Sequence, residues 1–469
     1  MLPRQAFVIV LLLAVALPAA AEPREVRRGI ELQLPIVRAS YYQFESGDFD
    51  GDGAADLAYT STEGTIPVWY HAGMFDPDAI RVGPEMLTNL EDHSVPGGTV
   101  GDYNGDGFDD LLVATHVAYA GYLTDYWVCP GGPEGLSEES RMLLSPIPQG
   151  QFLPWEGVVG GAHDEDGDGF DDAFLLQDYD QTRLGVYRGS PAGLPADPSL
   201  VLEAEHGFRA TVLDVDGDGF DDVVGAFKSN SQDMDTSTFF VWNGPLADGQ
   251  APTQLPPYTP ESYTDWVNLA PLTSGDVDGD GYDDLVTSYN LAVWPGSDAG
   301  LETSPSATVR PWGGWSFNAS TAVDVDGDGF VDVVTGVMPG WNNADGSIGP
   351  HPDEGNLFVF WGGPDFIRED RYVALPDGGV YDIDSIALRT QAGITGFARG
   401  SWDQEGEYLE VYQVPPPPPS QPASQPSSST GIVIEHDCGC TNGGGSVAAG
   451  WAAVVLAACG LRRRGRPSV

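Results

Sequence analysis

Short apolar runs alternate with polar turns along most of the chain. Segments such as "DLLVAT", "DVVGAF" and "DLVTSY" are β-branched and apolar, which is typical of buried strands. A second kind of apolar segment ends in a glycine turn, as in "WVCPGG", "FVWNGP" and "FVFWGG". The 61 glycines and 38 prolines favour many turns and few long helices. This pattern predicts an all-β protein.

The strands recur in six units of one design. Each unit has an extended segment, an acidic loop, an apolar strand, a variable connector and a strand that ends in a turn, and a weaker strand then follows. The acidic loops begin at intervals of about 54, 62, 50, 62 and 48 residues. Periods of roughly 40 to 60 residues with four short strands per unit are typical of the blades of a β-propeller.

A seventh blade is predicted from the segment that follows the sixth unit. "YDIDSIALRT", "GITGFARGS" and "GEYLEVYQV" supply three strands without an acidic loop, and a polyproline run begins at Pro415. The N-terminal segment "GIELQLPIV" (29–37) resembles the outer strands of the other units. We expect it to complete the last blade and to close the ring, because closure removes exposed sheet edges.

The acidic loops share one spacing of oxygen-bearing side chains. Carboxylate or amide oxygens stand at positions 1, 3, 5 and 9, and glycine stands at positions 4 and 6. Ca²⁺ prefers about six to eight hard oxygen ligands, whereas Mg²⁺ demands a strict octahedron. Glycine at position 6 permits the sharp turn, and the carbonyl at position 7 adds an oxygen. The sequence therefore predicts about six structural Ca²⁺ ions. The predicted ligands are Asp48, Asp50, Asp52 and Asp56 in the first loop (48–56), Asp102, Asn104, Asp106 and Asp110 in the second (102–110), Asp164, Asp166, Asp168 and Asp172 in the third (164–172), Asp214, Asp216, Asp218 and Asp222 in the fourth (214–222), Asp276, Asp278, Asp280 and Asp284 in the fifth (276–284), and Asp324, Asp326, Asp328 and Asp332 in the sixth (324–332).

The flanks of these loops exclude two other calcium-binding architectures. An EF-hand requires a glutamate at position 12 and helices on both sides, but position 12 holds residues of other types and apolar strands follow. Toxin-type nonapeptide repeats lie in tandem without long spacers, which these loops do not. The residues at position 12 are Tyr59, Val113, Leu175, Gly225, Thr287 and Thr335.

Taken as whole units, the segments resemble the FG-GAP repeats of the integrin alpha-chain β-propeller and the related bacterial VCBS repeats. The match spans residues 38–366, and an aromatic residue such as Phe44 or Phe208 often precedes the loop, but the literal FG and GAP tripeptides are missing. The resemblance implies that each calcium loop joins the first two strands of a blade and that the protein acts in adhesion. The missing tripeptides weigh against transferring one particular partner.

Charge and cysteine content exclude several classes of protein and partner. With 70 acidic against 20 basic residues and a formal net charge of -50, the chain lacks the basic surface that a nucleic-acid partner requires. The apolar fraction of 41% supplies a core, which argues against a disordered acidic chain. Cys129 is the one cysteine of the propeller region, so no disulfide can form within it. We interpret Cys129 as a buried structural thiol, and His163, beside the third loop, as filling a local polar site.

The two ends of the chain predict export and display. Residues 1–21 have the charged start, apolar run and small-residue end of a secretory signal peptide, with cleavage expected near Ala21. The propeller is assigned to 22–413 and a Pro/Ser-rich stalk to 414–437. Segment 438–469 combines cysteines, an apolar run and arginines. It is either a membrane anchor or a sorting signal similar to the MYXO-CTERM signals of myxobacteria, in which Cys438 or Cys440 marks the processing or attachment site.

The predicted function is adhesion or recognition of an extracellular protein or polysaccharide at the cell surface, with release after C-terminal processing left open. Two alternatives remain: a polysaccharide lyase or hydrolase, and a spacer with no ligand beyond calcium. No G-x-S-x-G or H-E-x-x-H motif is present. The register of the aspartates is explained by calcium, so it gives no separate sign of catalysis, and no enzyme is expected.

Overall fold

The computed structural model describes the strands of the propeller and the turns between many of them. The described residues are 27–33, 42–61, 66, 68–70, 80–83, 93–117, 124–144, 158–178, 180, 182–204, 208–228, 237–258, 272–287, 291–309, 316–338, 357–368, 372–375, 385–390, 393–402 and 407–413.

All of these residues belong to the first of two compact units, Met1–Pro417 and Pro418–Val469. The predicted signal peptide (1–21, with Ala21), the stalk (414–437) and the C-terminal segment (438–469, with Cys438 and Cys440) lie outside the described residues. Within the described ranges, no helix has the length and apolarity needed to cross a membrane.

The described strands pair into seven four-stranded sheets, and six of these are contiguous blades built from four consecutive strands. Neighbouring strands in every blade run antiparallel. The contiguous blades are β2 (Tyr42–Gly47), β3 (Asp56–Ser61), β4 (Val68–Tyr70) and β5 (Arg81–Val82); β6 (His93–Gly101), β7 (Asp110–Val117), β8 (Thr124–Cys129) and β9 (Met142–Leu143); β10 (Val158–His163), β11 (Asp172–Leu176), β12 (Arg183–Tyr187) and β13 (Leu200–Glu203); β14 (Phe208–Leu213), β15 (Asp222–Lys228), β16 (Ser237–Trp242) and β17 (Thr253–Gln254); β18 (Leu272–Gly275), β19 (Asp284–Thr287), β20 (Leu291–Trp294) and β21 (Ala307–Val309); and β22 (Ser316–Val323), β23 (Asp332–Met338), β24 (Leu357–Phe360) and β25 (Tyr372–Leu375).

The remaining sheet is composite, because it joins the two ends of the propeller region. It has the order β1-β28-β27-β26 and consists of β1 (Arg27–Gln33), β26 (Ser385–Thr390), β27 (Gly393–Trp402) and β28 (Glu407–Gln413). β1 pairs antiparallel with β28, with Arg27 opposite Gln413 and Gln33 opposite Tyr408. The N-terminal strand therefore lies at the outer edge of the last sheet. Its bounds lie toward the N-terminal side of the predicted segment 29–37.

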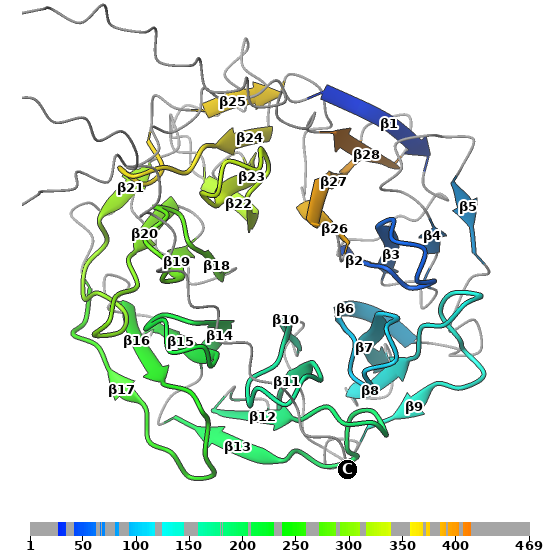
Figure 1. Ribbon diagram of the computed structural model, residues 1–469, viewed down its shortest axis with the longest axis horizontal. Helices are drawn as coiled ribbons and strands as arrows, with labels where there is room; N and C mark the ends of the chain where they lie inside the picture. The colour runs from blue at the N-terminus through cyan, green and yellow to red at the C-terminus, as the bar shows by residue number, and fades with distance from the viewer. Residues whose placement is uncertain are drawn as a thin grey trace, which may run out of the picture. The chain divides into compact units, whose positions relative to one another are not determined.

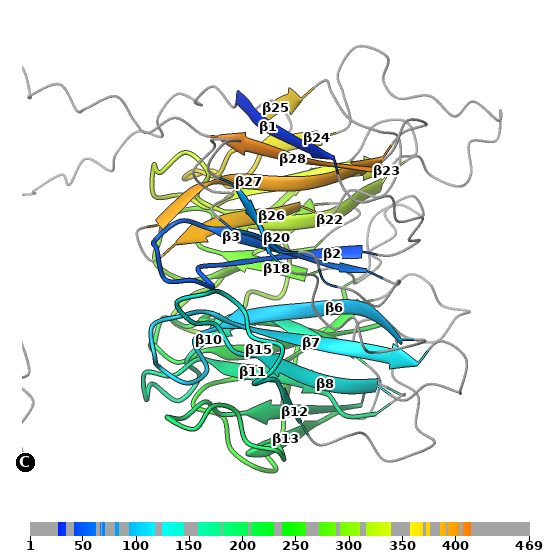
Figure 2. The same cartoon turned by 90° about the vertical axis from the view of Figure 1, so that its right-hand side faces the viewer.

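The sheets are arranged in a closed ring (Figure 1). The first strand of each contiguous blade is innermost, and β26 takes this place in the composite sheet. These inner strands contact one another in the cyclic order β2, β6, β10, β14, β18, β22, β26 and back to β2. Figure 2 shows the ring from the side, with strands such as β6, β7 and β27 running across its thickness. A closed ring of this kind leaves only short outer edges available for further pairing.

The hydrophobic core lies between neighbouring blades. One cluster joins Leu112 of the second blade, Phe174 of the third and Trp242 of the fourth. Middle strands are covered on both faces, which is why all five side chains of β11 are buried and why these strands are apolar runs without alternation. Cys129 is fully buried, and burial raises the pKa of its thiol to about 12, so its interpretation as a buried thiol is confirmed.

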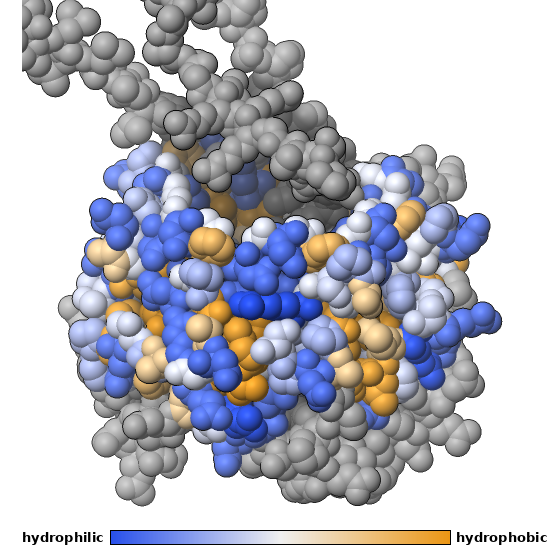
Figure 3. Space-filling view, turned by 60° about the horizontal axis from the view of Figure 1, so that its bottom comes forward, coloured by the Kyte–Doolittle hydropathy of each residue, from blue (hydrophilic) through white to orange (hydrophobic). Residues whose placement is uncertain are grey.

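The outer surface is mainly polar. In the view of Figure 3, hydrophilic residues separate the exposed apolar groups from one another. Among the described residues, the large hydrophobic side chains that are exposed are Val82 and Leu143, on the outermost strands β5 and β9. Isolated apolar side chains of this kind are ordinary on a soluble surface.

Candidate cation-binding loops

Each acidic loop joins the first and second strands of a contiguous blade. The loops lie between β2 and β3, β6 and β7, β10 and β11, β14 and β15, β18 and β19, and β22 and β23. In every blade the aspartate at position 9 is the first residue of the second strand. This is the placement that the resemblance to FG-GAP repeats implied.

A glycine pair curls each loop around the aspartate at position 1. Gly51 and Gly53 have φ angles of 72° and 85°, a region that side chains with a Cβ rarely adopt. The N–H of Gly53 donates to Asp48 Oδ2 at 2.9 Å. The same bond from position 6 to position 1 forms in the other five loops, where the donors are Gly107, Gly169, Gly219, Gly281 and Gly329.

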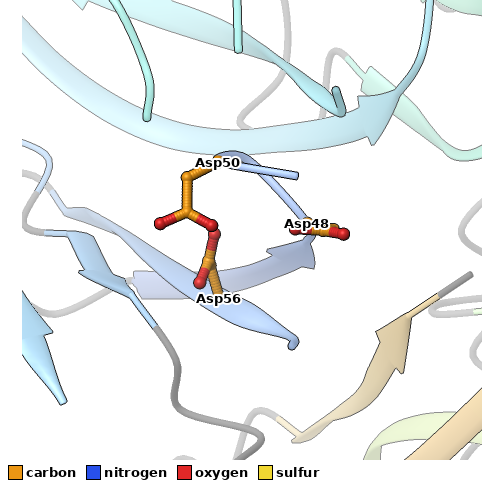
Figure 4. A group of neighbouring side chains, drawn as sticks. All are labelled: Asp48, Asp50 and Asp56. Atoms are coloured by element: carbon orange, nitrogen blue, oxygen red, sulfur yellow. The ribbon is translucent and has the colours of Figure 1, made fainter. Parts of the chain in front are cut away.

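The curled backbone brings three carboxylates together in five of the loops. Within each group, one oxygen of each side chain lies within 4.8 Å of the others. Figure 4 shows the first group, in which the carboxylates of Asp50 and Asp56 lie side by side and Asp48 lies across the loop from them. The groups are Asp48, Asp50 and Asp56; Asp164, Asp166 and Asp172; Asp214, Asp216 and Asp218; Asp276, Asp278 and Asp284; and Asp324, Asp326 and Asp332.

Most aspartates at position 5 stand outside these groups. Asp218 is included, but Asp52, Asp168, Asp280 and Asp328 are not. Their carboxylates accept backbone bonds from within the loop instead, as when the Tyr282 N–H donates to Asp280 at 3.1 Å. In the second loop the group is incomplete because Asn104 stands at position 3, and its amide donates to Asp110 at 3.3 Å. The predicted ligands Asp102 and Asp106 lie in that same loop, and Asp222 lies outside the group of the fourth.

The aspartate at position 9 has a second task that the sequence did not reveal. Asp284 accepts the Val277 N–H at 2.9 Å with one oxygen and the Gly296 N–H at 3.0 Å with the other. Gly296 lies in the turn that follows the third strand, so the carboxylate joins the acidic loop to that turn. Asp172, Asp222 and Asp332 bond in the same way. Asp56 accepts the Phe49 N–H of its own loop, and Asp110 accepts the Gly131 N–H of the turn.

These buried carboxylates are difficult to ionise together. Burial is the largest cause that raises the pKa of Asp110, Asp172, Asp222 and Asp284 to about 7, and neighbouring aspartates raise it further while backbone N–H bonds oppose the shift. Burial likewise raises the pKa of Asp332 well above its ordinary value. A cluster of this kind is stabilised in its charged form by a nearby cation.

The residues present fit a hard divalent cation. Asp48 Oδ1 and Asp166 Oδ1 are buried carboxylate oxygens that accept no hydrogen bond from the described residues, and such an oxygen is costly unless a ligand satisfies it. Each belongs to one of the grouped triplets. Oxygen-only groups of this size suit Ca²⁺, which accepts irregular geometry. The structure thus provides several aspartate clusters that could hold a metal ion.

Consecutive loops are joined by the residue at position 8. Asp109 of the second loop accepts the Asp48 N–H at 2.7 Å, and its own N–H donates to the Asp48 carbonyl at 3.1 Å. This reciprocal pair fixes the first loop against the second. Asp171 bonds in the same way to Asp102, at 2.7 and 3.3 Å, and Asp283 to Asp214, at 3.3 and 3.0 Å.

The loop-to-loop contact varies where position 8 or its partner differs. Val331 keeps only the backbone half, with its N–H donating to the Asp276 carbonyl at 2.9 Å. Asp221 instead lies 3.2 Å from His163 Nδ1, which confirms that His163 fills a local polar site. Sequence reasoning missed the role of position 8 because an aspartate beside four others was taken as part of the acidic window.

The aromatic residue at position 7 covers the glycine at position 4 of the preceding loop. A Cβ added to Gly51 would lie 2.5 Å from Phe108 Cε1, and one added to Gly105 would lie 2.5 Å from Phe170 Cε1. Nothing lies within 4 Å of a Cβ added to Gly53. The glycine at position 4 is therefore required both by its φ angle and by the neighbouring ring, and the glycine at position 6 by its φ angle alone.

A turn N–H from the next blade supports four of the loops from a third direction. Gly132 donates to the Phe49 carbonyl at 3.0 Å, and Ser190, Ser297 and Gly363 donate to the equivalent carbonyls. In the fourth blade Pro245 occupies this place and has no N–H to give. Leu246 donates to the side chain of buried Glu165 instead. Glu165, at position 2 of the third loop, thus replaces a lost backbone bond.

Comparison with known proteins agrees with this arrangement. Residues 48–113, which span the first two loops, match the family model of the FG-GAP-like repeat. The chain therefore contains an FG-GAP-like repeat within a β-propeller. It is 28% identical over 230 residues to integrin alpha-PS2 of Drosophila melanogaster, covering 40% of this chain and 15% of that protein. It is 28% identical over 221 residues to integrin alpha-IIb of Mus musculus, covering 40% of this chain and 20% of that protein. The match thus spans no more than a fifth of these relatives.

Among solved structures, the FG-GAP-type propeller is similar to BBS1N, crystallised in complex with ARL6DN and soaked with lead. The TM-score is 0.50 at 10% identity, and the match covers 83% of this chain and 97% of that one. At this identity the likeness concerns the fold alone.

Proposed function

We propose that this protein is an exported recognition or adhesion module, whose propeller is held rigid by Ca²⁺ in its acidic loops and binds an extracellular protein or polysaccharide. The observation that carries the proposal is that the loops are not independent. Several loops are held by residues of the next loop, as Asp48 is held by Asp109 and Asp102 by Asp171. An ion that fixes one loop therefore also fixes the neighbouring blade.

The proposed ion has a structural task. Carboxylates of the loops lie at junctions between blades, as Asp109, Asp171 and Asp283 show. Cys129 is the one cysteine of the propeller region, so no disulfide within it secures those junctions. A ligand that binds only the folded state stabilises it by roughly 2.7 kcal/mol at a hundredfold excess over its Kd. Even about 1 kcal/mol per loop, summed over several loops, is comparable to the whole stability of a typical domain, about 5–15 kcal/mol.

The recognition role is supported by the kind of proteins that share this region. Two integrin alpha chains match it, and the sequence predicts export, a stalk and a surface-attached C-terminal segment. The strongly acidic surface, with a formal net charge of -50, opposes polyanions and favours neutral or basic partners. We therefore expect partners among extracellular proteins and uncharged or basic polysaccharides.

The proposal is tested by binding of the purified full-length chain to panels of immobilised extracellular proteins and soluble polysaccharides, with Ca²⁺ or with EGTA. We expect retention on at least one probe with Ca²⁺, loss with EGTA, and recovery when Ca²⁺ is restored. Release of new sugar ends from a polysaccharide would instead show that the protein is an enzyme. If the protein binds Ca²⁺ but is retained on no probe, the result would favour a spacer with no ligand beyond calcium.

A further inference from the structure

The loops differ in what contacts the side chain at position 3. In the first blade, the Arg81 guanidinium donates to Asp50 Oδ2 at 3.2 Å. Arg81 lies on the outermost strand β5 and reaches the loop across the ring of Tyr70, with its guanidinium carbon 4.1 Å from the ring centroid. A positive charge of the chain itself therefore sits on one of the predicted cation ligands.

The second blade shows that this contact does not follow from the fold alone. Arg141 lies over the Trp127 ring at 4.7 Å, in a similar stacking arrangement, but its guanidinium pairs with Glu138 at 2.7 Å. The stacking of an arginine on a strand aromatic is thus common to both blades. Contact with the acidic loop is recorded for Arg81 and not for Arg141.

The third loop has an arginine whose charge is already balanced. Arg188 lies 3.3 Å from Asp166 Oδ2, but it also pairs with the fully buried Glu165 at 2.7 Å. In the fourth loop the neutral Asn243 contacts Asp216 at 3.2 Å. Among the described residues, Arg81 pairs with no carboxylate outside the loop. Arg81 therefore adds a positive charge to the first loop, whereas Glu165 offsets the charge of Arg188 in the third.

The fifth loop represents the opposite case. Within the described residues, no arginine, lysine or histidine forms an ion pair with Asp278. The fifth loop also has Asp283 at position 8, where the first loop has Ala55. The local charge is therefore more negative in the fifth loop than in the first.

We propose that Arg81 is a tethered counter-ion of the first loop, which makes this loop a weaker divalent-cation site than the fifth loop. The inference rests on the proposed binding of Ca²⁺ by the acidic loops. A cation that enters the first loop is repelled by the positive charge of Arg81, which lies against Asp50. The cation must displace the guanidinium or bind beside it. The loops then fill in a graded order as Ca²⁺ rises, with the first loop filling after the fifth.

The test is calorimetric titration of Ca²⁺ into the full-length chain and four variants. Arg81→Met removes the charge, Arg81→Lys keeps it, and Arg141→Met is the matched control on the second blade. Asp52→Asn removes a first-loop carboxylate and keeps an acceptor for the Ala54 N–H. Arg81 is 45% exposed, so its replacement should leave the fold intact.

We expect Arg81→Met to tighten the weakest class of sites by roughly three- to tenfold, the scale of one unit charge acting on a divalent ion across a solvated distance. Arg81→Lys and Arg141→Met should match the parent protein. Asp52→Asn should weaken or remove one weak site. In the double variant with Asp52→Asn and Arg81→Met, no site should bind Ca²⁺ more tightly than in Asp52→Asn alone.

Unchanged or weaker binding in Arg81→Met, with Ca²⁺ still bound, would overturn this inference and leave the proposed function standing. The same tightening in Arg141→Met would also overturn it, because the effect would then be one of net charge. Absence of Ca²⁺ binding by every protein, the parent included, would overturn the proposed function itself.

Discussion

At the scale of single residues, the aspartate at position 9 combines two roles that variants can separate. Asp284 accepts two backbone N–H bonds and is almost fully buried, whereas Asp280 at position 5 is exposed. Removing a buried acceptor leaves its donors unsatisfied, which costs about 1–3 kcal/mol for each group. Position 9 is therefore needed by the fold itself, whereas Asp280 lies outside the carboxylate group of its loop and accepts a bond from within that loop.

We predict that Asp284→Ala lowers the free energy of unfolding by about 2–4 kcal/mol both with EGTA and with Ca²⁺, because Val277 and Gly296 lose their acceptor. Asp280→Asn keeps an acceptor for the Tyr282 N–H and removes the charge, so it should have little effect in EGTA and a destabilising effect only in Ca²⁺. Chemical denaturation of both variants in both conditions measures the difference. Equal behaviour of the two variants would contradict the separation of roles.

At the scale of strands and loops, the sequence predicted the strands and acidic loops better than the junctions between blades. The apolar runs and the spacing of glycines identified the strands and placed each acidic loop between the first two strands of a blade. Those features are local, because they depend on the period of one strand or the φ angles of one turn. The N-terminal strand was recognised by its likeness to other outer strands, and it pairs with β28.

The junctions could not be predicted because they join residues about 60 positions apart. Asp109 was counted within an acidic window, although its carboxylate accepts a bond from the preceding loop. Phe108 was an aromatic within the repeat, although its ring covers Gly51. Glu165 accepts the Leu246 N–H, which is explained by Pro245, a residue that lacks the N–H that other blades supply. Such pairings depend on which loops are neighbours in space.

The two glycines of the first loop give a matched test of the junction. Ala at either position is strained by the positive φ angle, at a cost of roughly 1–2 kcal/mol. Gly51→Ala also forces a Cβ against Phe108 of the next blade, whereas the space beside Gly53 is open. We predict that Gly51→Ala destabilises the protein by at least about 1 kcal/mol more than Gly53→Ala. Equal thermal shifts for the two would show that the ring contact contributes nothing.

At the scale of the whole molecule, the buried carboxylates couple stability to pH. The folded-state pKa of Asp110, Asp172, Asp222 and Asp284 is about 7, above the ordinary range of aspartate. Between that range and about pH 7, the folded protein without cation holds more protons than the unfolded chain. Stability in EGTA therefore falls as pH rises through this window.

We predict that the melting temperature in EGTA is higher at about pH 5 than at about pH 7.5, and that the gain from Ca²⁺ grows over the same interval, because the cation requires ionised carboxylates. Thermal unfolding at several pH values, with and without Ca²⁺, measures both trends. A melting temperature in EGTA that rises with pH would contradict the assigned pKa direction.

The central claim is that divalent cations hold the junctions of a ring that has no disulfide among its described residues. Its most direct measurement is calorimetric melting of the full-length chain at neutral pH, first in EGTA and then in millimolar Ca²⁺. We expect the melting temperature to rise with Ca²⁺ and to continue rising with its concentration, as binding to the folded state alone requires. An identical melting temperature in EGTA and at every Ca²⁺ concentration would contradict the claim.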